Sequence, residues 1–401
     1  MLSTSAAARG SFEFDCIDAD FADGVEGVIT QAFTEPVTKP FAVVRIVTTP
    51  RRLEELAGGP GLPGNWFSLE IGPKGSAASM PTWHAQLQLN GFPSHSRGVT
   101  SNITYIESDE GGGPARPRPQ SIGAAVADQV TVPSAIIAAC ALPSATNTLQ
   151  AIAGILSSVA KVTTLRIKDV GQASFSSPCD KYGKTLLHYD VGFPISFNGH
   201  TSPKKFDIDP AEKPVVVLSH WDWDHLHAAF LHPHLMECVW IVPEQKLGPG
   251  AARLAHILAA KGGLLIHSTG VSTVFPSGEI AHANGPQGNL NNTGLTVQVE
   301  LESGRFALLT GDVDYRFLTH SGVRPINHLI ATHHGARFDS GSAAIPAPVS
   351  GSGKLLLSYG GHNVYRHPHP EALKLHAGAG WVNQVPTARY GALPRGDREV
   401  N

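Results

Sequence analysis

The chain contains the stretch Ser219-His220-Trp221-Asp222-Trp223-Asp224-His225, which directly follows the apolar run 215–218. A short run of valine and leucine predicts a buried strand, and a polar cluster at its end lies where a rigid scaffold presents reactive groups to solvent. On an extended loop, alternate side chains such as those of His220 and Asp222 can face one metal ion. The adjacent Asp224 and His225 can then turn toward a second ion, as the chain enters the helix expected over 226–236.

The ligand types in this stretch indicate what kind of site it forms. Imidazole nitrogen and carboxylate oxygen suit zinc and manganese, and a cluster without a thiolate favours an open catalytic site over a closed structural one. The alternative is a solvated loop in which Asp224 only caps the helix. Four potential ligands within six residues favour the metal site.

Three further apolar runs end in the same way. The run 306–309 precedes Gly311-Asp312, the run 328–331 precedes His333-His334-Gly335, and the run 355–357 precedes the histidine-rich segment 362–369. An aspartate such as Asp312 can bridge two cations, and paired histidines can supply one ligand and one acid or anion contact that faces the substrate. Which of His333 and His334 is the ligand stays open. Together the four strand ends predict a metal hydrolase.

The composition sets the chemical context. The 401 residues include 30 basic and 33 acidic ones, so no global charge points to nucleic acid or to an anionic membrane, and any polyanion site must be local. The four cysteines form no Cys-x-x-Cys pair and the start has no secretory signal, which favours a cytoplasmic protein without disulfides. The charge-free segment 129–160 is interrupted by Pro133 and Pro143, and therefore predicts two short packed helices rather than a membrane span.

The length and the distribution of histidines predict two parts. Only two of the 20 histidines lie before residue 188, so the chemistry belongs to a hydrolase domain over 161–401. Residues 1–160 form an N-terminal accessory region to which we assign no function from sequence. That region has strand-like runs at 41–47 and 85–89 and a Gly/Pro-rich loop or linker at 108–120.

The order of these motifs resembles that of the metallo-β-lactamase fold superfamily, within it the branch of the C-terminal hydrolase domain of the DNA-uptake proteins called ComEC. The resemblance covers about residues 165–373. It rests on six ordered segments, which are 169–172, 187–192, 219–225, 292–297, 333–335 and 360–370. The resemblance implies an α/β fold, an αββα sandwich of two sheets flanked by helices, with the metals at one rim.

The resemblance also implies roles for individual residues. One cation is held by His220, Asp222 and Asp312, and the other by Asp224, His225, Asp312 and one of His333 or His334; zinc is the first choice and manganese the alternative. Asp190 fixes the metal loop through hydrogen bonds. Catalytic roles fall to Asp224, His334 and His367, and substrate contacts to Asn363, His367 and His369.

Two segments depart from the family pattern. The turn 171–174 has Ala173-Ser174 where the family usually has glycine and aspartate, which changes the substrate loop. The segment 226–229 lacks the family's glycine pair and adds a histidine, His227. No clear histidine of the third motif lies between the metal loop and Asp312, although His256, His267 and His282 are available. The ligands of the first metal therefore stay open.

Two cations of this kind activate a bridging water and suit an in-line displacement at phosphorus. We therefore expect a phosphodiesterase, and because of the resemblance a nuclease acting on DNA or RNA. Local bases could track a nucleic-acid backbone or be ordinary surface residues; they are Lys181, Lys184, Lys204, Lys205, Arg316 and Arg337.

Two alternatives remain. The same fold could hydrolyse a small molecule such as a cyclic nucleotide, a phosphocholine ester, a lactone or a thioester. The chain could also be an effector subunit whose N-terminal region binds a protein partner, for example in a bacterial defence assembly.

Overall fold

The computed structural model describes most of the chain from residue 134 onward and the strands of the N-terminal region. The described residues are 2–3, 11–17, 33, 41–48, 53, 66–72, 80–87, 93–106, 134–144, 149–320, 326–349 and 353–401. The predicted linker 108–120 lies outside them.

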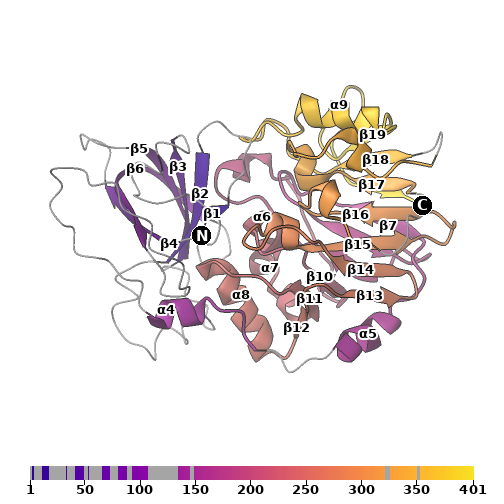
Figure 1. Ribbon diagram of the computed structural model, residues 1–401, viewed down its shortest axis with the longest axis horizontal. Coiled ribbons are helices and arrows are strands. Elements are labelled where there is room, and N and C mark those ends of the chain that lie inside the picture. Colours follow the sequence, from indigo (N-terminus) through magenta and orange to yellow (C-terminus); the bar gives the residue numbers. More distant parts are fainter. Residues whose placement is uncertain are drawn as a thin grey trace.

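Two seven-stranded sheets form the C-terminal part (Figure 1). The first has the order β12-β11-β10-β9-β8-β7-β20 and contains β7 (Thr164–Ile167), β8 (Ser176–Cys179), β9 (Leu187–Tyr189), β10 (Val215–Val217), β11 (Trp240–Pro243), β12 (Leu264–His267) and β20 (Arg398–Val400). The second has the order β13-β14-β15-β16-β17-β18-β19 and contains β13 (Ser272–Phe275), β14 (Gly278–His282), β15 (Leu295–Glu300), β16 (Phe306–Leu309), β17 (His328–Ile330), β18 (Lys354–Leu357) and β19 (Gln384–Pro386).

Alternating side chains fill three apolar layers of this part. In β10, Val216 packs with the helices on the outer face of the first sheet, whereas Val217 packs between the two sheets. In β18, Leu356 points into the same inter-sheet core and Leu355 points to the outer face of the second sheet. This period of two is expected for strands that are buried on both faces. The predicted αββα sandwich of two sheets flanked by helices is therefore confirmed.

Helices cover the outer faces and one edge of the sandwich. They are α5 (Leu149–Ser157), α6 (Trp223–Leu226), α7 (Ala228–Leu231), α8 (Pro249–Ala260) and α9 (Pro370–Gly378), with α4 (Ser134–Ala139) nearer the N-terminal strands and short 3₁₀ turns η1 (Ser196–Thr201), η2 (Pro233–Glu237), η3 (Asn291–Thr293), η4 (Tyr315–Phe317), η5 (Thr332–Gly335) and η6 (Ser342–Ala344). Both helices predicted in the charge-free segment are present, as α4 and α5. Among the described helices, none combines the length and apolar character needed to cross a membrane.

The segment 226–236 differs from the prediction of one continuous helix. It forms α6, α7 and η2 in succession. Pro233 begins η2, and a proline cannot donate the backbone hydrogen bond that would continue α7. The short α6 starts at Trp223, inside the histidine-aspartate stretch and three residues before the expected start, and so keeps Asp224 and His225 on adjacent positions of one turn.

A six-stranded antiparallel sheet forms the N-terminal part, at the left in Figure 1. Its order is β1-β2-β3-β5-β6-β4, from β1 (Leu2–Ser3), β2 (Ser11–Ile17), β3 (Phe41–Val47), β4 (Trp66–Gly72), β5 (Met80–Leu87) and β6 (Pro93–Ile106). Phe14, Val44, Ile46 and Leu53 form its own small core. The strand predicted at 41–47 is β3, and the run 85–89 overlaps the end of β5.

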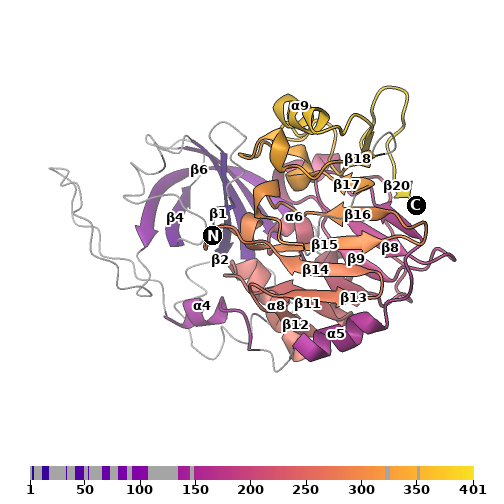
Figure 2. The ribbon, with the colours of Figure 1, turned by 45° about the vertical axis from the view of Figure 1, so that its right-hand side comes forward.

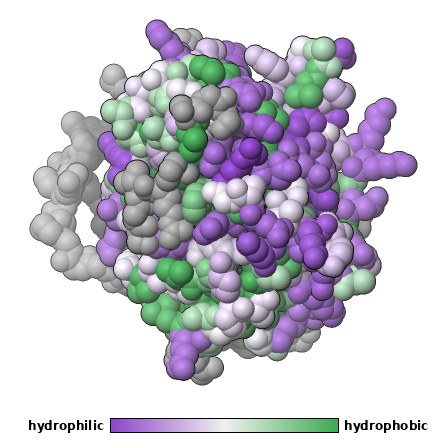
Figure 3. Space-filling view, turned by 90° about the vertical axis from the view of Figure 1, so that its right-hand side faces the viewer, coloured by the Kyte–Doolittle hydropathy of each residue, from purple (hydrophilic) through white to green (hydrophobic). Residues whose placement is uncertain are grey.

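The N-terminal sheet contacts the sandwich through the outer side of β2 and β3. The backbone NH of Gly250, in the first turn of α8, donates a hydrogen bond of 3.0 Å to Asp15 of β2, and Val43 of β3 packs against Ile195 and Trp223. Figure 2 shows β2 beside the loops that precede α8 and contain α6. Figure 3 shows the opposite end of the molecule, where hydrophilic side chains cover most of the face. The division at residue 160 stays a prediction.

Candidate metal centre

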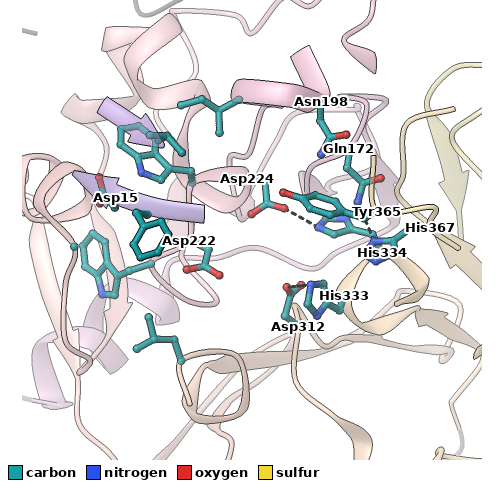
Figure 4. Close-up of a pocket in the computed structure, with 17 residues that line it drawn as sticks. Asp15, Gln172, Asn198, Asp222, Asp224, Asp312, His333, His334, Tyr365 and His367 are labelled. Atoms are coloured by element: carbon teal, nitrogen blue, oxygen red, sulfur yellow. Dashed lines mark hydrogen bonds and ion pairs between the residues drawn. The ribbon is translucent and has the colours of Figure 1, made fainter. Parts of the chain in front are cut away.

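Carboxylates and imidazoles from several strand ends gather in two groups. Asp224, His225 and His334 each offer an atom within 4.8 Å of the others, and so do His220, His225 and Asp312. His334 Nε2 lies 3.3 Å from Asp224 Oδ2, the contact drawn as a dashed line in Figure 4. Strand β10 of the first sheet and the parallel strands β16 and β17 of the second sheet end at this rim, which explains how residues more than 100 positions apart meet.

Asp312 is a member of the second group, in which it contacts His225, the residue that belongs to both groups. Its Oδ1 is 3.2 Å from His225 Nε2, and its Oδ2 is 3.2 Å from His333 Nε2 and 3.8 Å from His220 Nε2. Asp222 Oδ2 lies 3.4 Å from His220 Nε2. The structure thus brings together all seven side chains that the sequence predicts as metal ligands.

The donor atoms at the centre suit a metal because they are buried and otherwise unused. The Nε2 atoms of His220, His225 and His334 and Oδ1 of Asp312 are buried, and within the described part of the chain none makes a well-aligned hydrogen bond. Leaving such groups without partners is unfavourable unless an ion occupies the space between them. Nitrogen and oxygen donors without sulfur fit zinc, manganese or iron.

Hydrogen bonds at the far side of the rings fix which nitrogen faces the centre. His225 Nδ1 donates to Asp190 Oδ2 at 2.8 Å, and His334 Nδ1 donates to the carbonyl of Ser358 at 2.9 Å. Asp190 is fully buried and also accepts from the backbone NH and the hydroxyl of Ser219. Because Nδ1 carries the proton in both rings, Nε2 presents its lone pair to the centre. This is the position predicted for Asp190.

The electrostatics of the cluster favour cations. Burial opposes ionisation of Asp312, but the charges of His333 and His225 outweigh it and hold the pKa of Asp312 well below its ordinary value. Burial likewise opposes ionisation of Asp224, yet His225 and His334 lower its pKa to about 2. Burial opposes protonation of His225, but the charge of Asp312 favours it, and the pKa of His225 is raised well above its ordinary value. The carboxylates are thus ionised at neutral pH, and a bound metal would replace the protons of the imidazoles.

Unusual backbone at the end of β17 aims the paired histidines. His333 and His334 both have positive φ, 48° and 56°, a conformation that costs about 1–3 kcal/mol at a residue other than glycine. The backbone NH of His333 donates to the carbonyl of Gly311 at 2.9 Å, which ties this loop to the turn that carries Asp312. As a result His334 reaches Asp224 while His333 reaches Asp312.

A pocket opens onto the cluster. Its lining comes from both parts of the chain and consists of Phe14, Asp15, Val43, Gln172, Ile195, Asn198, Trp221, Asp222, Trp223, Asp224, Gly248, Leu290, Asp312, His333, His334, Tyr365 and His367. In Figure 4, Asp15 lies at the side of the N-terminal strands, and His333, Asp312 and His367 lie across the pocket.

The lining includes residues that sequence reasoning missed. Gln172 donates from its amide to His367 Nδ1 at 3.1 Å. It belongs to the segment 169–172, to which the family resemblance assigns no contact with the site. Asp15 and Val43 come from strands that carry no metal-binding pattern. The only signal that could have found them is the apolar alternation of β2 and β3, which predicts a strand but not its neighbour.

Other predicted residues lie outside this lining. Asn363 donates to the carbonyls of Gly360 and His367 and so closes its own loop, and the ring of His369 lies 5.4 Å from that of His367. Their contact with substrate stays a prediction. The histidines considered for the third motif bond elsewhere: His282 contacts the carbonyl of His267, His267 contacts the hydroxyl of Thr273, and His256 contacts the carbonyl of Ala139.

The half-buried position of Asp15 predicts a pH effect on stability. Burial raises the pKa of Asp15 from 3.8 to about 6, so the folded protein binds this proton more tightly than the unfolded chain. Stability is therefore lost as pH rises through this window and stays lower above it. We expect Asp15→Asn to raise the melting temperature at pH 8 and to change it much less at pH 4. Asp207→Asn, at an exposed site, serves as control. An equal shift at both pH values would contradict the prediction.

The comparisons with known proteins give one weak structural similarity. No family model matches the chain, and no curated protein matches it. Among solved structures it is similar to CmlA, a diiron β-hydroxylase from Streptomyces venezuelae, at 15% identity and a TM-score of 0.25. The similarity covers 43% of this chain and 35% of that chain, so the chain matches about a third of the length of CmlA. The resemblance to the ComEC branch stays a prediction.

Proposed function

We propose that the protein is a metal-dependent phosphodiesterase that cleaves DNA or RNA. The observation that carries this proposal is that two groups of nitrogen and oxygen donors meet at His225, which belongs to both, and that Asp312 contacts both His225 and His333. Asp224, His225 and His334 would hold one divalent cation, and His220 and Asp222 the other, with Asp312 shared. When bound, such ions activate water and neutralise charge on a phosphoryl oxygen.

His367 supports a phosphoryl substrate at this position. Its Nδ1 accepts the hydrogen bond from Gln172, so the neutral ring carries its proton on Nε2. Burial and the neighbouring His333 hold the pKa of His367 well below its ordinary value, which keeps the ring neutral. Nε2 is buried with no hydrogen-bond partner among the described residues. The ring can therefore donate to an oxygen of the substrate on which negative charge develops.

One observation favours a second candidate, a small-molecule metallohydrolase. The described residues that line the pocket include no lysine or arginine. Of the predicted backbone-tracking residues, Arg316 lies 3.7 and 3.5 Å from Asp314 and Asp339, and Arg337 lies 3.0 Å from Glu371. Such pairing reduces the attraction for a polyanion. A small ester with one charged group would not need these cations.

A cleavage screen separates the two candidates. Purified protein with zinc or manganese is incubated with supercoiled plasmid, single-stranded oligonucleotides and bis(p-nitrophenyl) phosphate. We expect cleavage of nucleic acid and of the chromogenic ester, both abolished by a chelator. Hydrolysis of the ester without nucleic-acid cleavage would favour the small-molecule candidate, and inactivity on all of them would contradict the phosphodiesterase proposal.

A further inference from the structure

Two strands of the N-terminal sheet reach the pocket side by side. Asp15 of β2 is the direct partner of Val43 in β3 in the antiparallel register, so both side chains leave the same face of the sheet. The neighbours Phe14 and Val44 are also paired, and they pack on the opposite side in the sheet's own core. The face of β2 and β3 that carries Asp15 and Val43 therefore packs against the sandwich.

Tight packing holds this face against the sandwich. Asp15 accepts the hydrogen bond from the backbone of Gly250, and a Cβ on Gly248 would lie 2.4 Å from Asp15 Oδ2. A Cβ on Gly250 would lie 2.0 Å from the indole of Trp223. No side chain fits between β2, the start of α8 and Trp223, so the three are fixed relative to one another.

The surface that results is apolar. Val43, Ile195 and Trp223 pack together, and all three line the pocket; we name these three residues the apolar wall. The described lining contains the carboxyl group of Asp15 and no lysine or arginine, so the binding of a second phosphate group is disfavoured here. A flat uncharged group gains from contact with an indole and two aliphatic side chains.

We propose that the N-terminal sheet completes the substrate site, and that the apolar wall receives the uncharged ring next to the scissile phosphoryl group, a nucleobase or another aryl group. The inference rests on the proposed phosphodiesterase function for the position of the phosphoryl group. It gives the accessory region a role in substrate specificity, with Val43 as the residue that decides it.

Binding of two phosphonates, which cannot be turned over, tests the apolar wall. Isothermal titration calorimetry of the full chain loaded with zinc compares phenylphosphonate with methylphosphonate. We expect the wild type to bind phenylphosphonate about tenfold more tightly, since burial of roughly 60 Å² of ring surface contributes about this factor. Val43→Asp should reduce the preference to below about twofold, and Val43→Ala should give an intermediate value.

Val44→Ala is the matched control, because it removes the same atoms from the next residue of β3 but from the side that faces the sheet's own core. It should keep the tenfold preference. The inference fails if the wild type binds neither phosphonate or shows no preference, if Val43→Asp keeps the preference, or if Val44→Ala loses it equally. Turnover of bis(p-nitrophenyl) phosphate is scored separately, so a preference without turnover would reject the proposed function alone.

Discussion

Asp312→Ala is expected to lower the rate of bis(p-nitrophenyl) phosphate hydrolysis by at least about 1000-fold, or ~4 kcal/mol in the activation barrier. The reason is that Asp312 lies 3.2 Å from His333 and 3.2 Å from His225, the histidine that belongs to both donor groups, so the substitution removes the ligand proposed to be shared by the two ions. Initial rates at saturating zinc or manganese, together with circular dichroism to verify the fold, measure the effect.

Asp339→Ala is the control for this substitution. The side chain of Asp339 is 88% exposed and pairs only loosely with Arg316, at 3.5 Å. Exposed pairs of this kind contribute little to stability, and we expect the variant to keep most of the activity. If Asp312→Ala retained more than about a tenth of the wild-type rate, Asp312 could not be shared between two ions.

Gly192→Ala is expected to lower the melting temperature by about 5 °C or more and to abolish activity. A Cβ at this position would lie 1.8 Å from the backbone carbonyl oxygen of Asp224. The same carbonyl accepts from the NH of Ser174, and the NH of Gly192 donates to the carbonyl of Ser174. The three loops interlock, so a methyl group can be accommodated only by moving the backbone that carries Asp224.

Gly154→Ala provides the matched substitution for this prediction. Gly154 lies on α5, where an added Cβ meets nothing within 4 Å, and alanine favours helix. Its melting temperature should stay equal to that of the wild type or rise slightly. Wild-type melting and activity in Gly192→Ala would show that the loops around Asp224 are not as closely packed as described.

Local sequence patterns predicted short buried strands that end in metal-binding residue types, and the family resemblance added the two-sheet sandwich. Each ligand follows a short apolar run, and parallel strands that end at one rim must bring such loops together. The polar residue types also favoured a metal site, because no other role in a folded protein is as plausible as metal binding for Asp224, His225 and Asp312. The hydrogen bond from His225 to Asp190 could be expected for a related reason, since a ligating imidazole needs an acceptor behind it.

Contacts between segments that lie far apart in the chain could not be predicted from local sequence patterns. Val43 is one valine in an apolar strand, and nothing local distinguishes it from Val44, although one faces the pocket and the other the sheet's core. Gln172 and His367 form a hydrogen bond although they lie 195 positions apart, and nothing in the sequence indicates that these two positions meet. The left-handed backbone of His333 and His334 also depends on the surrounding loops rather than on residue type, because histidine seldom adopts it.

Metal content measured by mass spectrometry tests the central claim most directly. After saturation with zinc and removal of excess metal, the wild type should retain two ions per chain. Asp224→Ala should retain about one, because Asp224 belongs to one donor group only. Wild-type protein without bound metal, or an unchanged two ions in both Asp224→Ala and Asp312→Ala, would contradict a dinuclear centre at these residues.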